Sequence, residues 1–160
     1  PQLIARINRE VTGVHYLKLE DPPVGPKLTR IRELTQDRMK IFGGLGGAYF
    51  LEELQRGAVG IMTGLAFPEI LVRIFHKFTS GDRLGAAETF DHYMPLIRYE
   101  AQPKIGLAFR KYIYQRRGLI ATTTVRHPGP TLDTYTAREL EEIIQRVGLS
   151  LEKVGVQEVI

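Results

Sequence analysis

Residues 13–20 read GVHYLKLE, a run that alternates in hydropathy and is rich in residues that favour strands. Asp21-Pro22-Pro23 ends this predicted strand, because proline cannot donate to a strand ladder. Lys18 stands in the middle of this apolar strand, between Leu17 and Leu19. A lysine in this setting either extends to solvent at an edge or points into a cavity. The residues alone favour extension to solvent, since unpaired lysine is rarely buried.

Working outward from this run, strand patterns alternate with helical ones. The predicted strands are 13–19, 39–42 and 58–62, and the predicted helices are 3–11, 28–34 and 49–56. The second strand runs into a glycine-rich turn, GGLGG at 43–47, and Gly57 closes the third helix. Strands that alternate with helices indicate βαβ units and a parallel sheet.

After Pro68 the apolar residues recur only at helical spacing. Two helices are predicted at 70–78, with Pro68 in the first turn, and at 84–97, capped by Asp82. A third is opened by Pro103 and runs through Ile113, and an irregular segment follows at 122–133. The last helix starts at a Thr136–Glu139 capping box and ends at Gly148. A parallel sheet needs cover on both faces, and a (β/α)₈ barrel spans about 250 residues. We therefore expect the last strand–helix units of a (β/α)₈ barrel over 1–80 and a helical region over 81–160.

Composition bounds the kind of protein. The 160 residues are 43% hydrophobic and 25% charged, as in ordinary globular domains. No cysteine is present, which excludes disulfides and thiolate metal sites. The sequence shows neither a secretory signal pattern nor the roughly 20 apolar residues that cross a bilayer. We expect a cytoplasmic protein with no membrane partner.

The net charge of +4 raises the question of a nucleic-acid partner. Only the stretch from Arg110 to Arg117 is densely basic, and it contains Tyr112 and Tyr114, an interleaving that suits single-stranded nucleic acid. The favoured interpretation is a solvated helix face above packed aromatic rings, with no nucleic acid bound. The alternative predicts an affinity that falls steeply with salt.

Several segments, taken in order, resemble the dihydrodipicolinate synthase/N-acetylneuraminate lyase family. Residues 13–20 resemble its sixth strand, 40–44 its seventh strand with a glycine turn, 56–64 its eighth strand, and 111–131, with Val125-Arg126-His127-Pro128, its closing helices. Lys18 then matches the lysine that forms a Schiff base with substrate in that family. The resemblance implies a lyase or dehydratase acting on a 2-oxo acid, pyruvate or a sugar-derived keto acid, without metal or organic cofactor.

The same resemblance assigns further site residues. It places Gly44 and Met62 at the border of the substrate site, and Gly64 just beyond the eighth strand. Where sialic-acid lyases carry acidic side chains after the seventh-strand glycine, this chain has Gly46 and Gly47, and where they carry a serine it has Gly64. These departures argue against sialic acid as the substrate.

Glu20 shares a face with Lys18, because side chains two apart in a strand point the same way. It either orients a substrate hydroxyl or acts in proton transfer, or it pairs with a neighbouring cation. Tyr16 lies on the same face and is interpreted as a packing residue of the barrel wall, whereas His15 lies on the opposite one. The four histidines, at 15, 76, 92 and 127, lack metal-ligand spacing.

The family's carboxylate-binding Gly-Thr-Thr turn and proton-shuttling tyrosine, which lie on earlier strands, have no counterpart in this sequence. We therefore expect an incomplete barrel, completed by further strands or by another chain. Unpaired strand edges favour association, so a homo-oligomer is expected. The alternative function is a structural or assembly piece without activity of its own, in which Lys18 is incidental.

Overall fold

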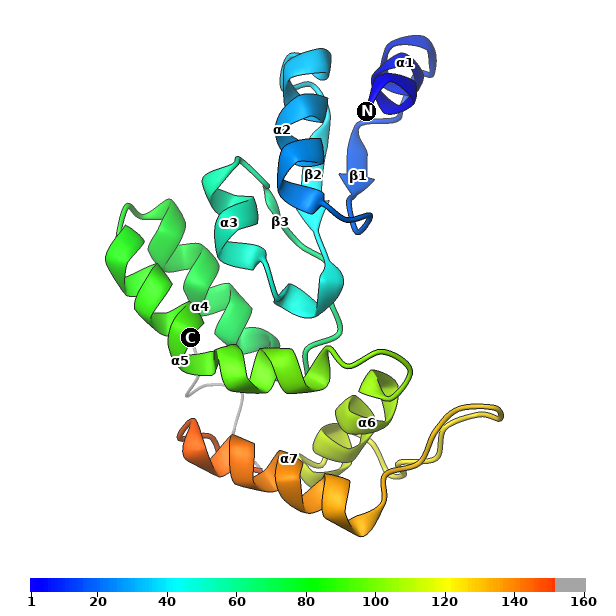
Figure 1. Ribbon diagram of the computed structural model, residues 1–160, viewed down its shortest axis with the longest axis vertical. Helices are drawn as coiled ribbons and strands as arrows, with labels where there is room; N and C mark the ends of the chain where they lie inside the picture. The colour runs from blue at the N-terminus through cyan, green and yellow to red at the C-terminus, as the bar shows by residue number, and fades with distance from the viewer. Residues whose placement is uncertain (152–160) are drawn as a thin grey trace. The chain divides into compact units, whose positions relative to one another are not determined.

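The computed structural model describes residues 1–151, and these form two compact units that divide after Thr63. The first unit contains α1 (Gln2–Glu10), β1 (Tyr16–Lys18), α2 (Val24–Thr35), β2 (Lys40–Gly43), the 3₁₀ helix η1 (Leu45–Gly47), α3 (Phe50–Gln55) and β3 (Gly60–Ile61) (Figure 1). The second contains α4 (Pro68–Thr79), α5 (Arg83–Glu100), α6 (Gly106–Arg116) and α7 (Thr134–Arg146). The predicted division after residue 80 stays a prediction.

The three strands of the first unit form one parallel sheet in the order β1-β2-β3. Leu17 lies beside Ile41, and Gly43 beside Ile61. The predicted parallel βαβ arrangement is therefore confirmed. β1 and β3 are shorter than predicted, because the ladder extends only over residues that meet a partner strand, and Gly13 leaves the extended region at φ +91°. β2 has the predicted length but begins one residue later, at Lys40.

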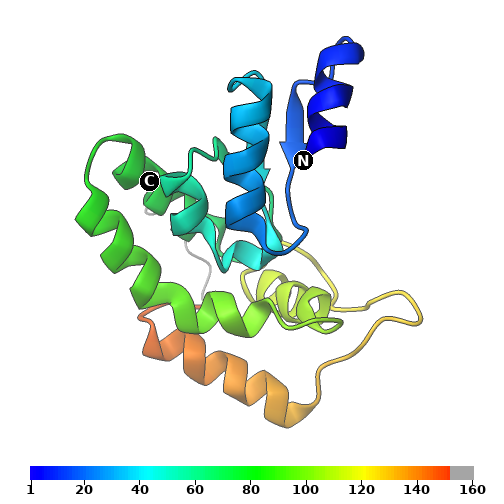
Figure 2. The same ribbon diagram turned by 45° about the horizontal axis from the view of Figure 1, so that its top comes forward.

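One face of this sheet is covered by helices. Along that face α2 packs against both α1 and α3 (Figures 1 and 2). Apolar side chains from the strands and helices meet in a core of Leu19, Val24, Leu28, Ile31, Met39, Ile41 and Ala58. The opposite face carries Tyr16, which is 67% exposed and whose ring centroid lies 6.2 Å from that of Phe42. Tyr16, interpreted as a barrel-wall residue, is thus largely exposed in this structure.

The described secondary structure of the second unit consists of helices. Helices α4 and α5 form a hairpin, and α5 also packs against α6 and α7. Buried side chains from all four helices form its core, among them Ile74, Phe90, Leu96, Ile97, Phe109, Ile113, Leu140 and Ile144. The side chain of Asp82 accepts a hydrogen bond from the Gly85 N–H, so the predicted cap of α5 is confirmed.

Two predicted helix starts are wrong. Helix α7 is capped by Asp133, whose carboxylate accepts the Thr136 N–H at 2.9 Å, so Thr136 lies in the first turn and is not the cap. The chain is extended at Asp133, and this fixes the start of the helix three residues earlier. Helix α6 begins at Gly106 and not at Pro103, because Lys104 adopts a left-handed φ of +73°, which no α-helix can contain.

Among the described residues, no helix combines the length and apolar character needed to span a bilayer.

Candidate active site

Lys18 is the last residue of β1 and lies on the sheet face that the helices leave open. Its side chain is 42% exposed, and its Nζ lies 3.2 Å from Glu20 Oε2. Lys18 is thus partly exposed in this structure, and its ammonium group lies beside a carboxylate. The structure also shows that Glu20 pairs with a cation, which was one of the two roles left open for this carboxylate.

Glu20 is held from a second side by the turn that follows β2. Its Oε1 accepts a hydrogen bond from the Leu45 N–H at 3.0 Å, so each carboxylate oxygen has its own partner. A Cβ on Gly44 would collide with the Glu20 side chain. Glycine at 44 therefore allows the carboxylate to approach the backbone, and the structure brings Lys18, Glu20 and Gly44 together as the sequence predicted.

Met62 continues the ladder beyond β3. Its N–H donates to the Gly43 carbonyl oxygen at 3.0 Å, and its side chain is 43% exposed. The C-terminal ends of three parallel strands thus place Lys18, Gly44 and Met62 along one edge of the sheet. Gly64 belongs to the second unit, where a Cβ on it would lie 2.8 Å from the Arg110 guanidinium. Gly64 is therefore described with the second unit, two residues after Met62 in the chain.

A buried glutamate beneath this edge was missed by the sequence analysis. Glu53 of α3 is 1% exposed, and neither carboxylate oxygen has a hydrogen-bond partner of standard geometry among the described residues. Burial raises the pKa of Glu53 to about 7; the Gly44 N–H opposes the shift, and the charges of Glu52 and Glu20 add to it. A sequence signal existed, since Glu53 lies three residues after Phe50 and next to Leu54, on the apolar side of the helix.

The segment that leads into α4 is clamped by buried charges of the second unit. The Ala66 N–H donates to Glu100 Oε2 at 3.0 Å, and the Ala66 carbonyl accepts from Arg117 at 2.7 Å. Arg117 also pairs with Glu69 at 2.6 Å. Burial raises the pKa of Glu100 to about 7, which the Ala66 N–H and the charge of Arg110 oppose in part.

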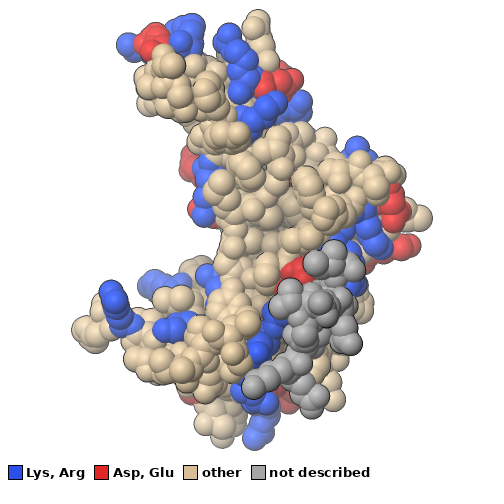
Figure 3. Space-filling model, turned by 180° about the vertical axis from the view of Figure 1, so that it is seen from behind, with Lys and Arg blue, Asp and Glu red and all other residues tan. Residues whose placement is uncertain are grey.

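These pairs change the interpretation of the basic stretch. The side chains of Arg110 and Arg117 are only 25% and 14% exposed, so they do not form the solvated helix face that was expected. Arg116 pairs with Glu141. On the face shown in Figure 3, Lys and Arg lie in separated groups, several of them beside Asp or Glu. Much of the positive charge in this stretch is thus used in pairs within the second unit.

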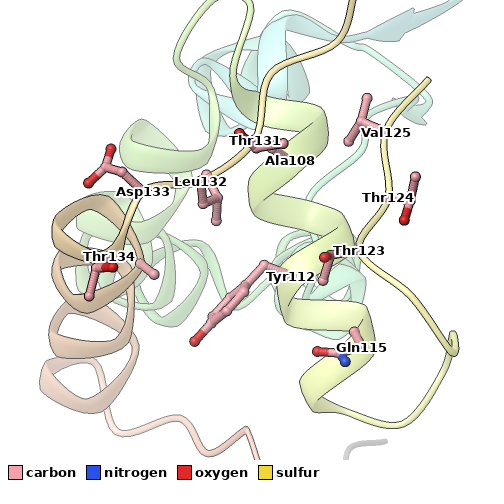
Figure 4. A pocket seen from close by; sticks show the side chains of 11 residues that line it. Ala108, Tyr112, Gln115, Thr123, Thr124, Val125, Thr131, Leu132, Asp133 and Thr134 are labelled. Carbon is pink, nitrogen blue, oxygen red and sulfur yellow. The ribbon is translucent and has the colours of Figure 1, made fainter. Parts of the chain in front are cut away.

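A hollow lies between α6, α7 and the irregular segment that joins them. This cavity of about 560 Å³ is bordered by Tyr112, Thr123, Thr124 and Asp133 among others (Figure 4). The Tyr112 hydroxyl donates to Glu141, and Asp133 caps α7. Tyr112 and Asp133 therefore have structural partners, and none of the predicted site residues lines the cavity. Within the described part of the chain, no group of three or more His, Asp or Glu is placed to hold a metal ion.

Comparison with known proteins gives a consistent result. A family model described as the dihydrodipicolinate synthetase family matches residues 23–147. The chain is 32% identical over 145 residues to L-2-keto-3-deoxyarabonate dehydratase of Azospirillum brasilense, covering 90% of this chain and 47% of that relative.

Solved structures with the same fold include two dihydrodipicolinate synthases. The enzyme from Rhodopseudomonas palustris superposes with a TM-score of 0.87 at 36% identity, over 91% of this chain and 50% of that one. The enzyme from Thermotoga maritima gives a TM-score of 0.81 at 20% identity, over 94% and 51%, and supports the fold alone. The chain thus spans about half the length of these relatives.

Three parallel strand–helix units with one open sheet face, followed by a helical part, define a partial (β/α)₈ barrel, as the sequence predicted. The match over residues 23–147 makes the assignment specific: the chain belongs to the dihydrodipicolinate synthetase family.

Proposed function

We propose that this protein is a lyase or dehydratase that acts on a 2-oxo acid through an imine on Lys18. The observation that carries the proposal is the position of Lys18 at the C-terminal end of β1, with Glu20 3.2 Å away and the Gly44 turn beside it. Barrel enzymes keep their reacting groups at this end of the strands. The name of the Azospirillum relative supports a sugar-derived keto acid as the substrate.

The chemistry begins with the proton on the lysine. Only a neutral amine can attack a ketone, so Lys18 must first release a proton, and Glu20 is close enough to accept it. The Nζ then bonds to the C2 carbon, and the carbonyl oxygen leaves as water with one proton from Nζ and the proton that Glu20 accepted. The protonated imine withdraws electrons from the C3–H bond. When that proton is removed, the resulting enamine expels a hydroxyl group from C4, which leaves as water after protonation.

Glu20 is well oriented for the proton transfers in this scheme. The Leu45 N–H fixes Oε1, which leaves Oε2 directed at the lysine. In the proposed scheme Glu20 then accepts the C3 proton and returns it to the departing C4 hydroxyl, since its Oε2 faces the imine nitrogen on the open face of the sheet. Glu20 is therefore proposed as the acid–base partner of Lys18.

The open sheet face indicates that the site needs further chain to cover it. Tyr16 and Met62 are exposed on a parallel sheet, a kind of sheet that is normally covered on both faces. We propose that further strands, from the same protein or from another copy, close the barrel over Lys18 and provide the group that binds the substrate carboxylate. Where the strands come from another copy, pairing along the edges of β1 and β3 would produce this closure and a homo-oligomer together.

Deuterium exchange into pyruvate tests the proposal without needing the natural substrate. An imine makes the methyl protons acidic, so in D₂O the methyl signal in the proton NMR spectrum should decay. The chain is tested alone and joined behind the preceding half of the Azospirillum relative. Lys18→Ala should abolish the exchange, whereas Lys40→Ala, which removes an exposed lysine from the neighbouring strand, should not.

A structural or assembly role is the second candidate. It is favoured by the exposure of Lys18 and by its ion pair with Glu20, which together suit a surface residue as well as a reactive one. Absence of exchange both in the chain alone and in the joined protein would support this role and reject the enzyme.

A further inference from the structure

Two consecutive glycines at the end of β2 each leave room for a carboxyl group. A Cβ on Gly44 would collide with Glu20, and a Cβ on Gly43 would collide with the carboxyl of Glu53. Successive residues of a strand point to opposite faces. Glu20 therefore lies on the open face with Lys18, and Glu53 lies on the helix-covered face, with the backbone of Gly43 and Gly44 between them.

Glu53 occupies a place where a carboxyl group is unfavourable. It is 1% exposed, its oxygens have no hydrogen-bond partner of standard geometry in the described chain, and it borders a cavity of about 360 Å³ with apolar walls that include Pro22 and Leu45. Arg56 borders the same cavity but donates to Thr29. Burial of a polar group without a partner destabilises a fold, and an apolar side chain of similar size would avoid this. Stability of the fold therefore does not explain a carboxyl group here.

We propose that Glu53 is a positioning residue of the Lys18–Glu20 pair. Its buried carboxyl packs against Gly43 and fixes the path of the backbone from Gly43 to Leu45. The Leu45 N–H in turn holds Glu20 Oε1 at 3.0 Å, and this leaves Oε2 beside Lys18. The catalytic meaning of this arrangement rests on the proposed function, but the arrangement itself does not.

Ionisation of Glu53 provides a way to observe its effect on the backbone that holds Glu20. The charged groups around it are Glu52 on its own helix, Glu20 on the far side of the glycines and Arg56 at the end of α3. The neutral carboxyl packs against Gly43 without repelling Glu20. Above a pH of about 7 the carboxyl ionises, and its repulsion of Glu20 shifts the backbone that Glu20 rests on.

Amide NMR of the whole chain tests this directly. In the parent, the Leu45 N–H resonance should move with a midpoint near pH 7, and Glu53→Gln should remove that step. Glu53→Ala should shift the Leu45 N–H at every pH, because the backbone loses its packing partner. Glu52→Gln removes an exposed charge from the same helix and should keep the step. Glu100→Gln should also keep it, although Glu100 titrates in the same range.

Two results would overturn the proposal: a Leu45 step that persists in Glu53→Gln, or a Leu45 N–H that Glu53→Ala leaves in place. Pyruvate exchange adds the functional measurement, in which Glu53→Ala should be about tenfold slower than the parent or more, as expected for a misplaced acid–base group. Glu53→Gln should retain the parental rate at pH 6. If the parent itself shows no exchange, the proposed function fails, and the Leu45 resonance still decides the role of Glu53.

Discussion

Lys18 Nζ lies 3.2 Å from Glu20 Oε2, on the one face of the sheet that no helix of the first unit covers. The other oxygen of the same carboxylate accepts the Leu45 N–H. The carboxylate is therefore fixed by the turn after β2, while it contacts the lysine at the end of β1. This geometry links the two strand ends, and most of the testable consequences follow from it.

Glu20→Gln should slow deuterium exchange into pyruvate by about a hundredfold, because the amide retains the shape of the side chain but cannot accept the lysine proton. The measurement is the decay of the methyl signal in D₂O. Asp21→Asn, at the neighbouring position with an 80% exposed side chain, should exchange like the parent. Equal rates for Glu20→Gln and the parent would remove Glu20 from the proposed mechanism.

Gly44→Ala should lower the free energy of unfolding by about 1–3 kcal/mol, because the added methyl group collides with Glu20. Backbone strain contributes little, since Gly44 has a φ of −161°, which any residue adopts. Denaturant unfolding of Gly44→Ala, Glu20→Ala and the double variant isolates the collision. The loss caused by Gly44→Ala should largely disappear when Glu20 is already alanine, and an unchanged loss would show that another contact is responsible.

The free energy of unfolding should fall as the pH rises from about 4.5 to about 7. Glu53 and Glu100 have pKa values raised from 4.5 to about 7, so the folded state binds protons more tightly than the unfolded chain over that interval. Each group contributes at most about 3 kcal/mol, and the curve should flatten above pH 7. Denaturant midpoints across this range measure the effect. Glu100→Gln should reduce the slope, and a stability that rises over the interval would contradict the burial of both carboxyls.

Arg117→Ala should destabilise the second unit by about 2 kcal/mol, because it leaves both the Ala66 carbonyl and Glu69 without their partner. Arg138→Ala removes an exposed arginine from α7 and should change stability by less than about 0.5 kcal/mol. Thermal unfolding of the two variants under the same conditions gives the comparison. Equal losses would show that the clamp on Ala66 contributes nothing specific.

Those features of the site that follow from local sequence rules could be predicted. Asp21-Pro22-Pro23 marks the end of the strand that carries Lys18, so Glu20 could be placed at the strand end, and alternation placed it on the same face as Lys18. Glycine at 44 was expected at the border of the site, although the reason for it, the close approach of Glu20, became visible only in the structure.

Other features depend on contacts between distant parts of the sequence. The clamp on Ala66 joins residues 34 and 51 positions apart, and helical periodicity gives no indication of such pairs. Arg110 and Arg117 were interpreted as surface charges for the same reason, since their partners Glu100 and Glu69 lie on other helices. The spacing of Glu53 to Phe50 could have identified it as a buried residue. Its packing against Gly43 could not have been predicted.

Borohydride trapping tests the central claim most directly. The chain, alone and joined behind the preceding half of the Azospirillum relative, is incubated with pyruvate and borohydride, and the intact mass and the labelled peptide are then determined. We expect one reduced adduct on the peptide that contains Lys18, unchanged in Lys40→Ala and absent from Lys18→Ala. An adduct on another lysine, or no adduct in either form of the protein, would contradict the assignment of Lys18 as the imine-forming residue.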